Sequence, residues 1–401
     1  MNPNSPSRRL GAQRASLDHA SILPDLPRGS RVLLIRLRSL GDIVLLTPSL
    51  RLLKSWRPDL HVSVAVEERF CALLRGNPSV DEVLALSGAK GWRRAKHQVR
   101  TVRELRRKKF ALAVNLHGGP ASVFLTRFSK ARWKVGFAHF RSRRIYSFLV
   151  PDARAILNQD TVHTAEHHAA ALFWLGLPRQ AVPPAELYVS ENAREGWTNQ
   201  AVRLGLKPGQ GYALMHPAAL YSTKQWPADR FAELGHYVEE ETGLAPVFSC
   251  GPGESWTLDD VESAFGRSIR RVEAPGLDQF MAAIAGCRLF IGNDSGPAHM
   301  AAALGRPLVV IFGSSNSKLW RPWAGSEVFQ RSIPDHAKDN FRVVQNSFEC
   351  NPCPGDRCYR YDRPECILSV RMDQVKDAVH SIFKTIREVN QIAATDESES
   401  R

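Results

Sequence analysis

The chain has 401 residues, of which 43% are hydrophobic and 23% are charged, enough apolar material for the cores of two ordinary domains. No stretch approaches the ~20 consecutive apolar residues of a membrane-spanning helix, because Arg, Lys or Asp interrupts every promising run. The 54 Lys and Arg outnumber the 40 Asp and Glu, and the net charge of +14 indicates either an anionic partner or a surface charged for solubility.

The first segment, residues 1–28, is rich in Ser, Pro and Arg and lacks the continuous apolar stretch of a secretory signal. We therefore expect it to be a disordered tail and the protein to stay in the cytoplasm. The seven cysteines, in a chain without such a signal, argue against a disulfide framework.

Short apolar runs then alternate with amphipathic helical stretches, a pattern that predicts βαβ units and parallel sheets with helices on both faces. In the first half, strands are expected at 31–37, 61–66, 80–86 and 111–116, and a helix at 43–56. After Leu177 the chain becomes rich in proline, which indicates an interdomain linker near Pro183. The first Rossmann-like domain is thus expected at 29–182.

A second series of strands is expected at 212–216, 245–250, 289–292 and 307–312, with helices that begin near Pro227, Glu254, Leu277 and Pro297. These form a second Rossmann-like domain at 183–375, followed by a C-terminal helix and a disordered end at 376–401. Ligands of open parallel sheets bind at the carboxyl ends of the strands, so the loops there are where chemistry is expected.

The turn at 292–299, Gly-Asn-Asp-Ser-Gly-Pro-Ala-His, lies between an expected strand and an expected helix. Ser295 and Gly296 can expose backbone N–H groups to a phosphate at the positive end of the helix. Asp294 can bind a sugar hydroxyl, and His299 lies one helical turn further on, within reach of a diphosphate. The alternative is an ordinary N-cap with a packed histidine.

Two further loops of the second half contain charged candidates. Lys224, followed by Trp226 and Pro227, is placed to neutralise a leaving diphosphate, although a lone loop lysine is more often only solvated. Glu254 follows Gly253 and is placed to bind a ribose, although glutamates at helix starts are common.

In the first half, Ser39-Leu40-Gly41-Asp42 lies where the first strand turns into its helix. Asp42 is then directed across the cleft at the second domain, where a carboxylate can deprotonate an acceptor hydroxyl. The alternative is that it caps the following helix.

The segment from Lys90 to Lys109 holds ten Lys and Arg against the single acidic residue Glu104. It is interpreted as a solvated face, a nucleic-acid patch or a site for a phosphorylated lipid. Nucleic acid is the least favoured, because no known binding motif or interleaved aromatic series accompanies the charge.

Four cysteines, Cys350, Cys353, Cys358 and Cys366, have the spacing C-x2-C-x4-C-x7-C in a loop with Pro and Gly. They indicate either a structural zinc site or reduced, redox-labile thiols, and the spacing matches no common zinc module. The other cysteines, Cys71, Cys250 and Cys287, have apolar neighbours and are expected in the core.

Taken together, these motifs resemble those of glycosyltransferase family 9, the ADP-heptose:lipopolysaccharide heptosyltransferases. The resemblance extends from Arg31 to about Val379 and rests on residues 35–42, on Lys224-Gln225-Trp226-Pro227 and on residues 293–299. The cysteine loop is also similar to one in many members.

The resemblance implies a GT-B fold, with two Rossmann-like domains, an active site between them and a C-terminal helix that returns to the first domain. It implies inverting, metal-independent transfer of a heptose from ADP-heptose to the phosphorylated inner core of lipopolysaccharide, with no cofactor. By the resemblance, Asp42 is the general base, and the donor is bound by Lys224, Glu254, Asp294, Ser295, Gly296 and His299. The acceptor-binding positions are Trp92, Arg93, Arg94 and Lys96.

Other functions remain open on this sequence. The same fold hosts nucleotide-sugar epimerases, and a transferase that uses another nucleotide sugar is a further alternative. A third is a noncatalytic protein that binds anions or glycolipids. For a transferase, the basic surface suggests peripheral association with the cytoplasmic face of the inner membrane, where a lipid-linked acceptor is found.

Overall fold

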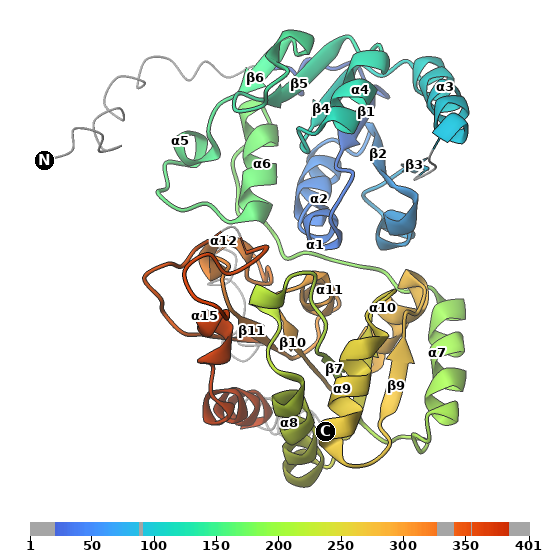
Figure 1. The fold of residues 1–401 in the computed structure, drawn as a ribbon. Coiled ribbons are helices and arrows are strands. Elements are labelled where there is room, and N and C mark those ends of the chain that lie inside the picture. The colour runs from blue at the N-terminus through green and yellow to red at the C-terminus, as the bar shows by residue number, and fades with distance from the viewer. Residues whose placement is uncertain (1–20, 88–90, 327–340, 354, 385–401) are drawn as a thin grey trace, which may run out of the picture.

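The computed structural model describes residues 21–87, 91–326, 341–353 and 355–384, and within 91–98 it describes the backbone only. It contains two six-stranded sheets, each with helices packed against it, and Figure 1 shows the two bodies one above the other. This arrangement of two parallel α/β units confirms the predicted fold class.

The first sheet has the strand order β3-β2-β1-β4-β5-β6, and every neighbouring pair in it is parallel. Its strands are β1 (Arg31–Ile35), β2 (His61–Glu67), β3 (Glu82–Leu86), β4 (Leu112–Asn115), β5 (Trp133–Phe137) and β6 (Phe148–Val150). Parallel neighbours require helical crossovers, and the order places β1 beside β4, where the direction of winding changes.

The helices around this sheet are α1 (Leu40–Val44), α2 (Thr47–Trp56), α3 (Gly91–Arg107), α4 (Pro120–Phe128), α5 (Ala153–Leu157) and α6 (Thr164–Trp174). A 3₁₀ helix, η2 (Glu68–Leu74), follows β2, and another, η3 (Arg143–Ile145), precedes β6. The single helix expected at 43–56 is divided into α1 and α2. Pro48 lies in the first turn of α2, where its missing N–H costs nothing, whereas inside one continuous helix it would remove a hydrogen bond.

The second sheet has the order β12-β11-β10-β7-β8-β9 and is also parallel throughout. Its strands are β7 (Tyr212–His216), β8 (Ala245–Cys250), β9 (Arg270–Glu273), β10 (Leu289–Asn293), β11 (Leu308–Phe312) and β12 (Phe341–Gln345). Its helices are α7 (Glu191–Arg203), η4 (Ser222–Lys224), α8 (Ala228–Thr242), α9 (Ser255–Phe265), α10 (Leu277–Gly286), α11 (Gly296–Ala303), α12 (Ser317–Trp320), α15 (Glu365–Leu368) and a helix at 372–384.

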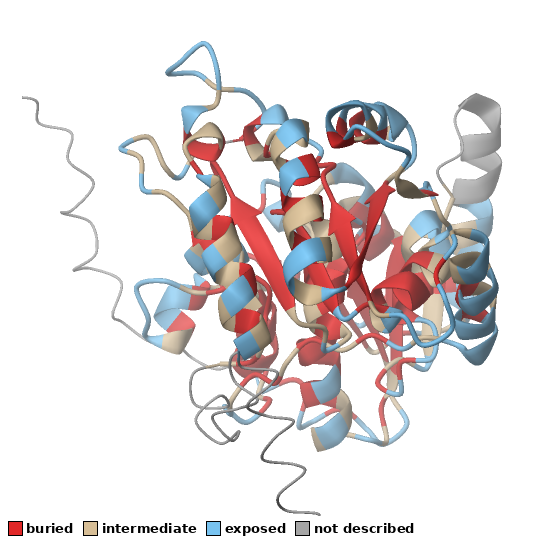
Figure 2. Ribbon diagram, turned by 90° about the horizontal axis from the view of Figure 1, so that it is seen from below, coloured by how far each residue is buried: buried red, intermediate tan, exposed pale blue. Residues whose placement is uncertain are grey.

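The central strands of both sheets are almost completely buried, as strands covered by helices on both faces must be. Every residue of β8, β10 and β11 is buried. In Figure 2 the strands are red between helices whose outward faces are pale blue. Their continuous apolar runs explain why these strands were the easiest elements to predict.

The segment just before β1 differs from the expected disordered tail. Ile22, Leu23 and Leu26 are buried in the core of the first domain. The backbone N–H groups of Ile22 and Leu23 both donate to the Leu175 carbonyl, at 3.1 and 3.0 Å, and Arg57 donates to the carbonyls of Leu23 and Leu26. The prediction was therefore wrong for residues 21–28, because a short apolar triad in a polar segment gives little compositional signal. Residues 1–20 lie outside the described residues.

The helix at 372–384 also differs from the expectation. It begins before the expected boundary at residue 376, and Val375, Val379 and Ile382 pack into the core of the second domain. Lys376 forms an ion pair with Glu233 of α8 at 2.8 Å. Over the described residues the helix thus belongs to the second domain and does not return to the first, because its apolar face is already covered. Residues 385–401 lie outside the description.

The chain crosses between the domains after α6. Trp323 donates its indole N–H to the Pro183 carbonyl at 2.8 Å, and the Leu187 N–H donates to the Ala303 carbonyl at 3.2 Å. Figure 1 shows this crossing segment running between the two bodies to α7. The segment also contacts the first domain, because the Glu186 N–H donates to the Thr47 hydroxyl of α2 at 3.1 Å, so it is held by both domains.

Candidate active site between the two domains

Two turns from opposite domains meet where α1 and α11 pack together (Figure 1). A Cβ atom built on Gly41 would lie 2.8 Å from Cδ2 of His299, and one built on Gly296 would lie 2.8 Å from a methyl carbon of Leu40. Neither glycine leaves room for a side chain, so both are needed for this approach. The turn that contains Asp42 and the turn that precedes α11 are thus brought together, as the candidate site requires.

Asp42 is the third residue of α1, and its side chain is 12% exposed. Its Oδ2 accepts hydrogen bonds from the Ser39 hydroxyl at 2.9 Å and from the Ser39 N–H at 3.3 Å, while Oδ1 forms an ion pair with Arg36. The helix begins at Leu40 with Ser39 as its N-cap, so Asp42 is not the N-cap of a helix from Ile43; from the third helical position it instead accepts from the N-cap residue, as the acidic member of a capping box does. This contact with Ser39 does not exclude the catalytic interpretation, because the same carboxylate lies on α1, at the contact with α11 of the other domain.

The electrostatic surroundings keep Asp42 ionised. Burial alone would raise the pKa of its carboxyl, but the adjacent Arg36 guanidinium, together with the Ser39 N–H, lowers the pKa below its usual value. Asp42 is therefore an anion at neutral pH and is able to accept a proton.

Four buried or half-buried histidines lie near this carboxylate, and the sequence analysis singled out only His299 among them. Burial lowers the pKa of His168 to about 3 and that of His167 to about 4. Burial also lowers the pKa of His117. These rings come from the loop after β4 and from α6, so no spacing in the sequence signals them. The pairing of β4 with β1 and the packing of α6 on α2 bring them near.

Lys224 and Asp294 form an ion pair of 2.8 Å between the loops that follow β7 and β10. The Asp294 side chain is 5% exposed and that of Lys224 is 23% exposed, so Lys224 is not the solvated loop lysine of the alternative interpretation. Asn293 ties the same loops together: its Nδ2 donates to the Pro217 carbonyl and its Oδ1 accepts from the Trp226 N–H. Adjacent strands β7 and β10 thus present one joined loop surface.

The start of α11 has unused hydrogen-bonding groups. Ser295 is its N-cap residue, with extended backbone, and no side-chain hydrogen bond caps the helix. The Ser295 Oγ and the His299 Nδ1 are buried without a protein partner among the described residues. Free N–H groups at a helix start, next to such atoms, suit an anion. Burial lowers the pKa of His299, so its ring is neutral.

Glu254 lies at the N-cap of α9, and its Oε2 accepts the Gly251 N–H at 2.9 Å. This contact holds its own loop together, as the simpler interpretation expects. The residue lies at the carboxyl end of β8, beside β7, so a ribose contact stays a prediction for it.

The basic helix is α3. The structure gives no side chains for Trp92, Arg93, Arg94 and Lys96, so these predicted acceptor positions lie outside the described part. Further along, Arg100, Arg103, Arg106 and Arg107 are exposed. Within the described residues, no helix is both long and apolar enough to span a bilayer.

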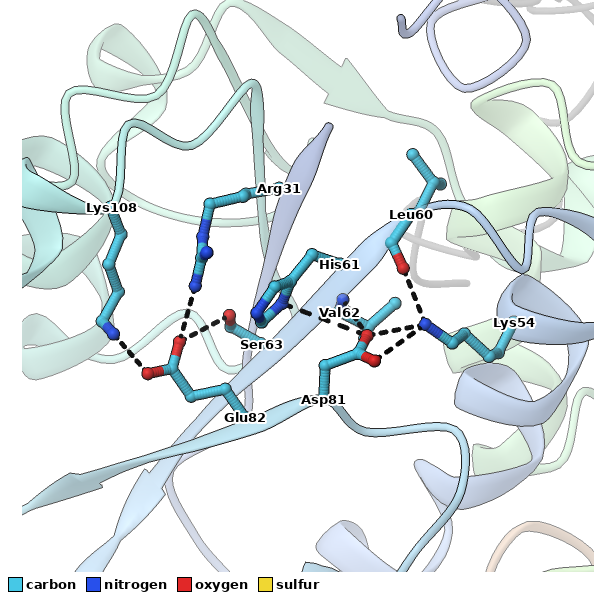
Figure 3. Close-up of polar contacts among 9 residues, drawn as sticks. All are labelled: Arg31, Lys54, Leu60, His61, Val62, Ser63, Asp81, Glu82 and Lys108. Atoms are coloured by element: carbon cyan, nitrogen blue, oxygen red, sulfur yellow. Dashed lines mark hydrogen bonds and ion pairs between the residues drawn. The ribbon is translucent and has the colours of Figure 1, made fainter. Parts of the chain in front are cut away.

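Lys108, just after α3, does not contribute to that exposed charge. It pairs with Glu82, which also receives the Arg31 guanidinium at 3.0 Å (Figure 3). Lys54 and Asp81 form a neighbouring pair at 2.7 Å. This network lies at the amino ends of β1, β2 and β3, opposite the candidate site, and so serves stability.

The four clustered cysteines line one small cavity together with Thr223 and Ser314. All four are free thiols, and burial raises the pKa of Cys366 to about 11. No group of three or more His, Cys, Asp or Glu residues in the described parts of the chain is arranged to hold a metal ion. The loop also touches the candidate site, because the Thr223 hydroxyl, next to Lys224, donates to the Gly355 carbonyl.

The other three cysteines were expected in the core, and the structure agrees for two of them. Cys250 and Cys287 are buried, and Cys71 is half-buried.

Comparison with known proteins identifies the family. The family model described as glycosyltransferase family 9 (heptosyltransferase) matches residues 98–350. That range contains Lys224, Glu254 and the turn before α11, and it begins after Asp42. Lipopolysaccharide heptosyltransferase 3 of Escherichia coli K12 is 26% identical over 294 residues, which cover 71% of this chain and 82% of that protein. Lipopolysaccharide heptosyltransferase 2 of the same strain is 26% identical over 305 residues, which cover 73% and 85%.

Solved structures show the same fold. A family 9 glycosyltransferase from Veillonella parvula has a TM-score of 0.75 at 22% identity, covering 89% of this chain and 98% of that one. The ADP-heptose lps heptosyltransferase II of E. coli has a TM-score of 0.69 at 19% identity, covering 89% and 99%. With its family model matched over more than half of its length and its two six-stranded parallel sheets, this chain belongs to glycosyltransferase family 9, the heptosyltransferases, and is a glycosyltransferase of GT-B fold.

Proposed function

We propose that this protein transfers a heptose, with inversion and without a metal ion, from ADP-heptose to the inner core of lipopolysaccharide. The observation that carries the proposal is the contact between α1 and α11, which sets an ionised Asp42 against the turn of Ser295 and His299. The E. coli relatives named as lipopolysaccharide heptosyltransferases support the choice of sugar and acceptor.

In the proposed reaction, an acceptor hydroxyl attacks the anomeric carbon of the heptose as Asp42 removes its proton. The new bond joins the acceptor oxygen to that carbon, and the bond from the carbon to the β-phosphate oxygen breaks. ADP leaves with the electron pair, and the configuration at the carbon inverts because attack comes from the opposite face.

The donor diphosphate is assigned to the joined loops of the second domain. Lys224 supplies a positive charge, and the start of α11 supplies backbone N–H groups, where negative charge grows on the leaving ADP. Asp294 orients Lys224 and can also accept from a sugar hydroxyl. Glu254 is assigned to the ribose.

The direct test is ADP release by the purified protein given ADP-heptose, with and without a core lipopolysaccharide that lacks heptose. Acceptor-dependent release is expected. Conversion of the nucleotide sugar without any acceptor would instead show an epimerase. Ligand binding without turnover for every nucleotide sugar tried would show a noncatalytic binding protein, and release only with another nucleotide sugar would correct the donor.

The role of Asp42 is tested by Asp42→Asn. This change keeps the size of the side chain but removes its charge, so transfer should fall by at least ~100-fold, the usual contribution of general base catalysis. Calorimetric affinity for ADP should stay within about threefold of wild type, because the nucleotide is assigned to the other domain. Full transfer activity in this variant would remove Asp42 from the reaction.

We further propose that the exposed face of α3 associates with anionic lipid at the cytoplasmic face of the inner membrane. Arg100, Arg103, Arg106 and Arg107 are exposed, and the described acidic residue among them is Glu104. Each such cation adds roughly 1 kcal/mol near an anionic surface at moderate ionic strength.

This surface is tested by flotation with vesicles of phosphatidylcholine, with or without phosphatidylglycerol. Binding should require the anionic lipid and weaken with added salt. The double variant Arg103→Glu and Arg106→Glu should lose binding, whereas Arg203→Glu, an exposed arginine on α7, should keep it. Equal loss in both variants would show a nonspecific effect of net charge and contradict the assignment.

A further inference from the structure

Arg36 is a largely buried arginine that other contacts hold in place beside Asp42. Its side chain is 14% exposed. Its backbone N–H donates to the Ala65 carbonyl at 3.1 Å, and its Nη1 donates to the Leu116 carbonyl at 2.6 Å. The guanidinium is therefore fixed at the carboxyl ends of β1, β2 and β4, where a parallel sheet places its ligand site.

The remaining Nη of Arg36 pairs with Oδ1 of Asp42, while Ser39 binds Oδ2 from the other side. The carboxylate is thus held by a cation on one oxygen and by two hydrogen bonds on the other. These contacts on both oxygens restrict rotation of the carboxylate group. Each oxygen still has a lone pair that can accept a proton.

Arg36 is the permanent cation beside Asp42 in the described structure. The other titratable groups near Asp42 come from α6, from α11 and from the loop after β4: His167, His168, His299 and His117. Burial lowers the pKa of each of these rings, so they are neutral at neutral pH. None of them can replace the charge of Arg36.

Packing alone does not account for an arginine at this position. Its Nε is buried without a hydrogen-bond partner in the described part of the chain. Burying a charged group is costly, and apolar replacements of buried ion pairs are often as stable or more so. An arginine that keeps an unmatched N–H beside a candidate base therefore calls for a functional explanation.

We propose that Arg36 is a positioning residue for the transfer reaction, which holds the Asp42 carboxylate as an anion at the contact between α1 and α11. The inference rests on the proposed function, since it takes Asp42 as the general base. It assigns to Arg36 no contact with the donor.

The test is the pH profile of kcat/KM for wild type, Arg36→Gln and Arg36→Lys, measured as acceptor-dependent ADP release. An opposite charge at this range lowers the pKa of an Asp by about 1–3 units. In Arg36→Gln the acid limb should therefore move up by at least about one pH unit, a tenfold loss on that limb. Arg36→Lys keeps the charge, so its limb should stay within about half a unit of wild type, with a lower kcat.

A matched control is Arg57→Gln. Like Arg36, Arg57 has a mostly buried side chain (15% exposed), pairs with an aspartate, here Asp59, and donates to backbone carbonyls. It lies near the segment 21–28, away from Asp42. It should lose thermal stability without a shift of the acid limb. If Arg36→Gln does not fold, Arg36→Lys decides the question: a limb moved by a full unit despite the retained charge would overturn the proposal.

Two failures are distinguishable. If wild type shows no acceptor-dependent release, the proposed function fails. If wild type is active but the acid limb of Arg36→Gln stays in place while its affinity for ADP is unchanged, Arg36 has only a structural role.

Discussion

The ion pair of Asp294 and Lys224 bears on stability and, under the proposed function, also on donor binding. Asp294 is buried, and an unpaired carboxylate there would be costly, so Lys224 stabilises the fold; in the proposed site it would also supply positive charge to the diphosphate. The two contributions can be separated by a second substitution. The stability contribution of Lys224 disappears when the charge of Asp294 is removed, whereas its proposed contribution to ADP binding requires the lysine in either case.

Lys224→Met should lower the free energy of unfolding by about 1–3 kcal/mol, since it leaves Asp294 without its cation. It should also weaken ADP binding at least tenfold. Adding Asp294→Asn removes the buried charge, so the double variant should regain most of the stability and none of the affinity. Denaturation by urea and titration calorimetry with ADP measure the two effects.

The control for this pair is Lys376→Met. Lys376 pairs with Glu233 at the same distance of 2.8 Å, but both side chains are more exposed, at 32% and 57%. A surface pair contributes about 0–1 kcal/mol, so this variant should be nearly as stable as wild type and bind ADP normally. Wild-type ADP affinity in the Lys224 double variant would exclude Lys224 from the phosphate site.

At the scale of elements, the segment 21–28 behaves as part of the first domain. Leu23 is fully buried beside the end of α6, and Arg57 of the turn after α2 binds the carbonyls of the segment. The apolar contacts and the capped carbonyls together hold a stretch without regular secondary structure against the core.

Leu23→Ala should therefore cost about 2–5 kcal/mol in the free energy of unfolding, the usual range for a buried leucine. Val202→Ala on α7, at a side chain that is 60% exposed, is the control and should cost less than about 0.5 kcal/mol. Urea denaturation measures both, and equal midpoints for Leu23→Ala and wild type would mean that the segment does not contribute to the core.

Strands were predicted correctly from the sequence where the residues of the strand itself are mostly apolar. Strands β7 and β8 were predicted at their observed bounds, because short, mostly apolar runs bounded by turns indicate a buried strand. Strand β9, Arg270–Glu273, is largely polar and was missed. It lies at the edge of its sheet, where one neighbour is enough and little burial is required.

At the scale of the whole molecule, the buried histidines control the response to acid. Burial lowers the pKa of His163 and His168 to about 3, and that of His167 and His216 to about 4. In the unfolded chain each has its ordinary pKa of about 6.5. Between these values the unfolded chain binds more protons than the native one, so stability is complete above about pH 6.5 and falls as the pH drops below it.

The melting temperature should therefore fall steadily as the pH is lowered from about 6.5 to 5. The carboxylates do not account for a loss in that window. Arg36, Lys54 and Lys108 help to hold the pKa values of Asp42, Asp81 and Glu82 below their usual values, so their contribution is lost only in more acidic solution. Scanning calorimetry across this range measures the effect, and a constant melting temperature down to pH 5 would contradict it.

The sequence by itself determined the α/β class, the central strands and the loops in which polar residues follow those strands. These features depend on apolar periodicity and on turn chemistry, which act over a few neighbouring residues. The turns around Asp42 and Ser295 were found in this way, and the pattern of residues within them was sufficient to suggest the family.

Only the tertiary structure decided which groups face each other. Arg36 and Asp42 meet because β1 and α1 fold back on each other, and Lys224 meets Asp294 because β7 and β10 are neighbours in the sheet. The charge state of a buried group depends on its burial and on partners distant in the chain, so it cannot be predicted from a local sequence pattern. The same reason explains why the buried residues of the segment 21–28 and the neutral histidines were seen only in the folded molecule.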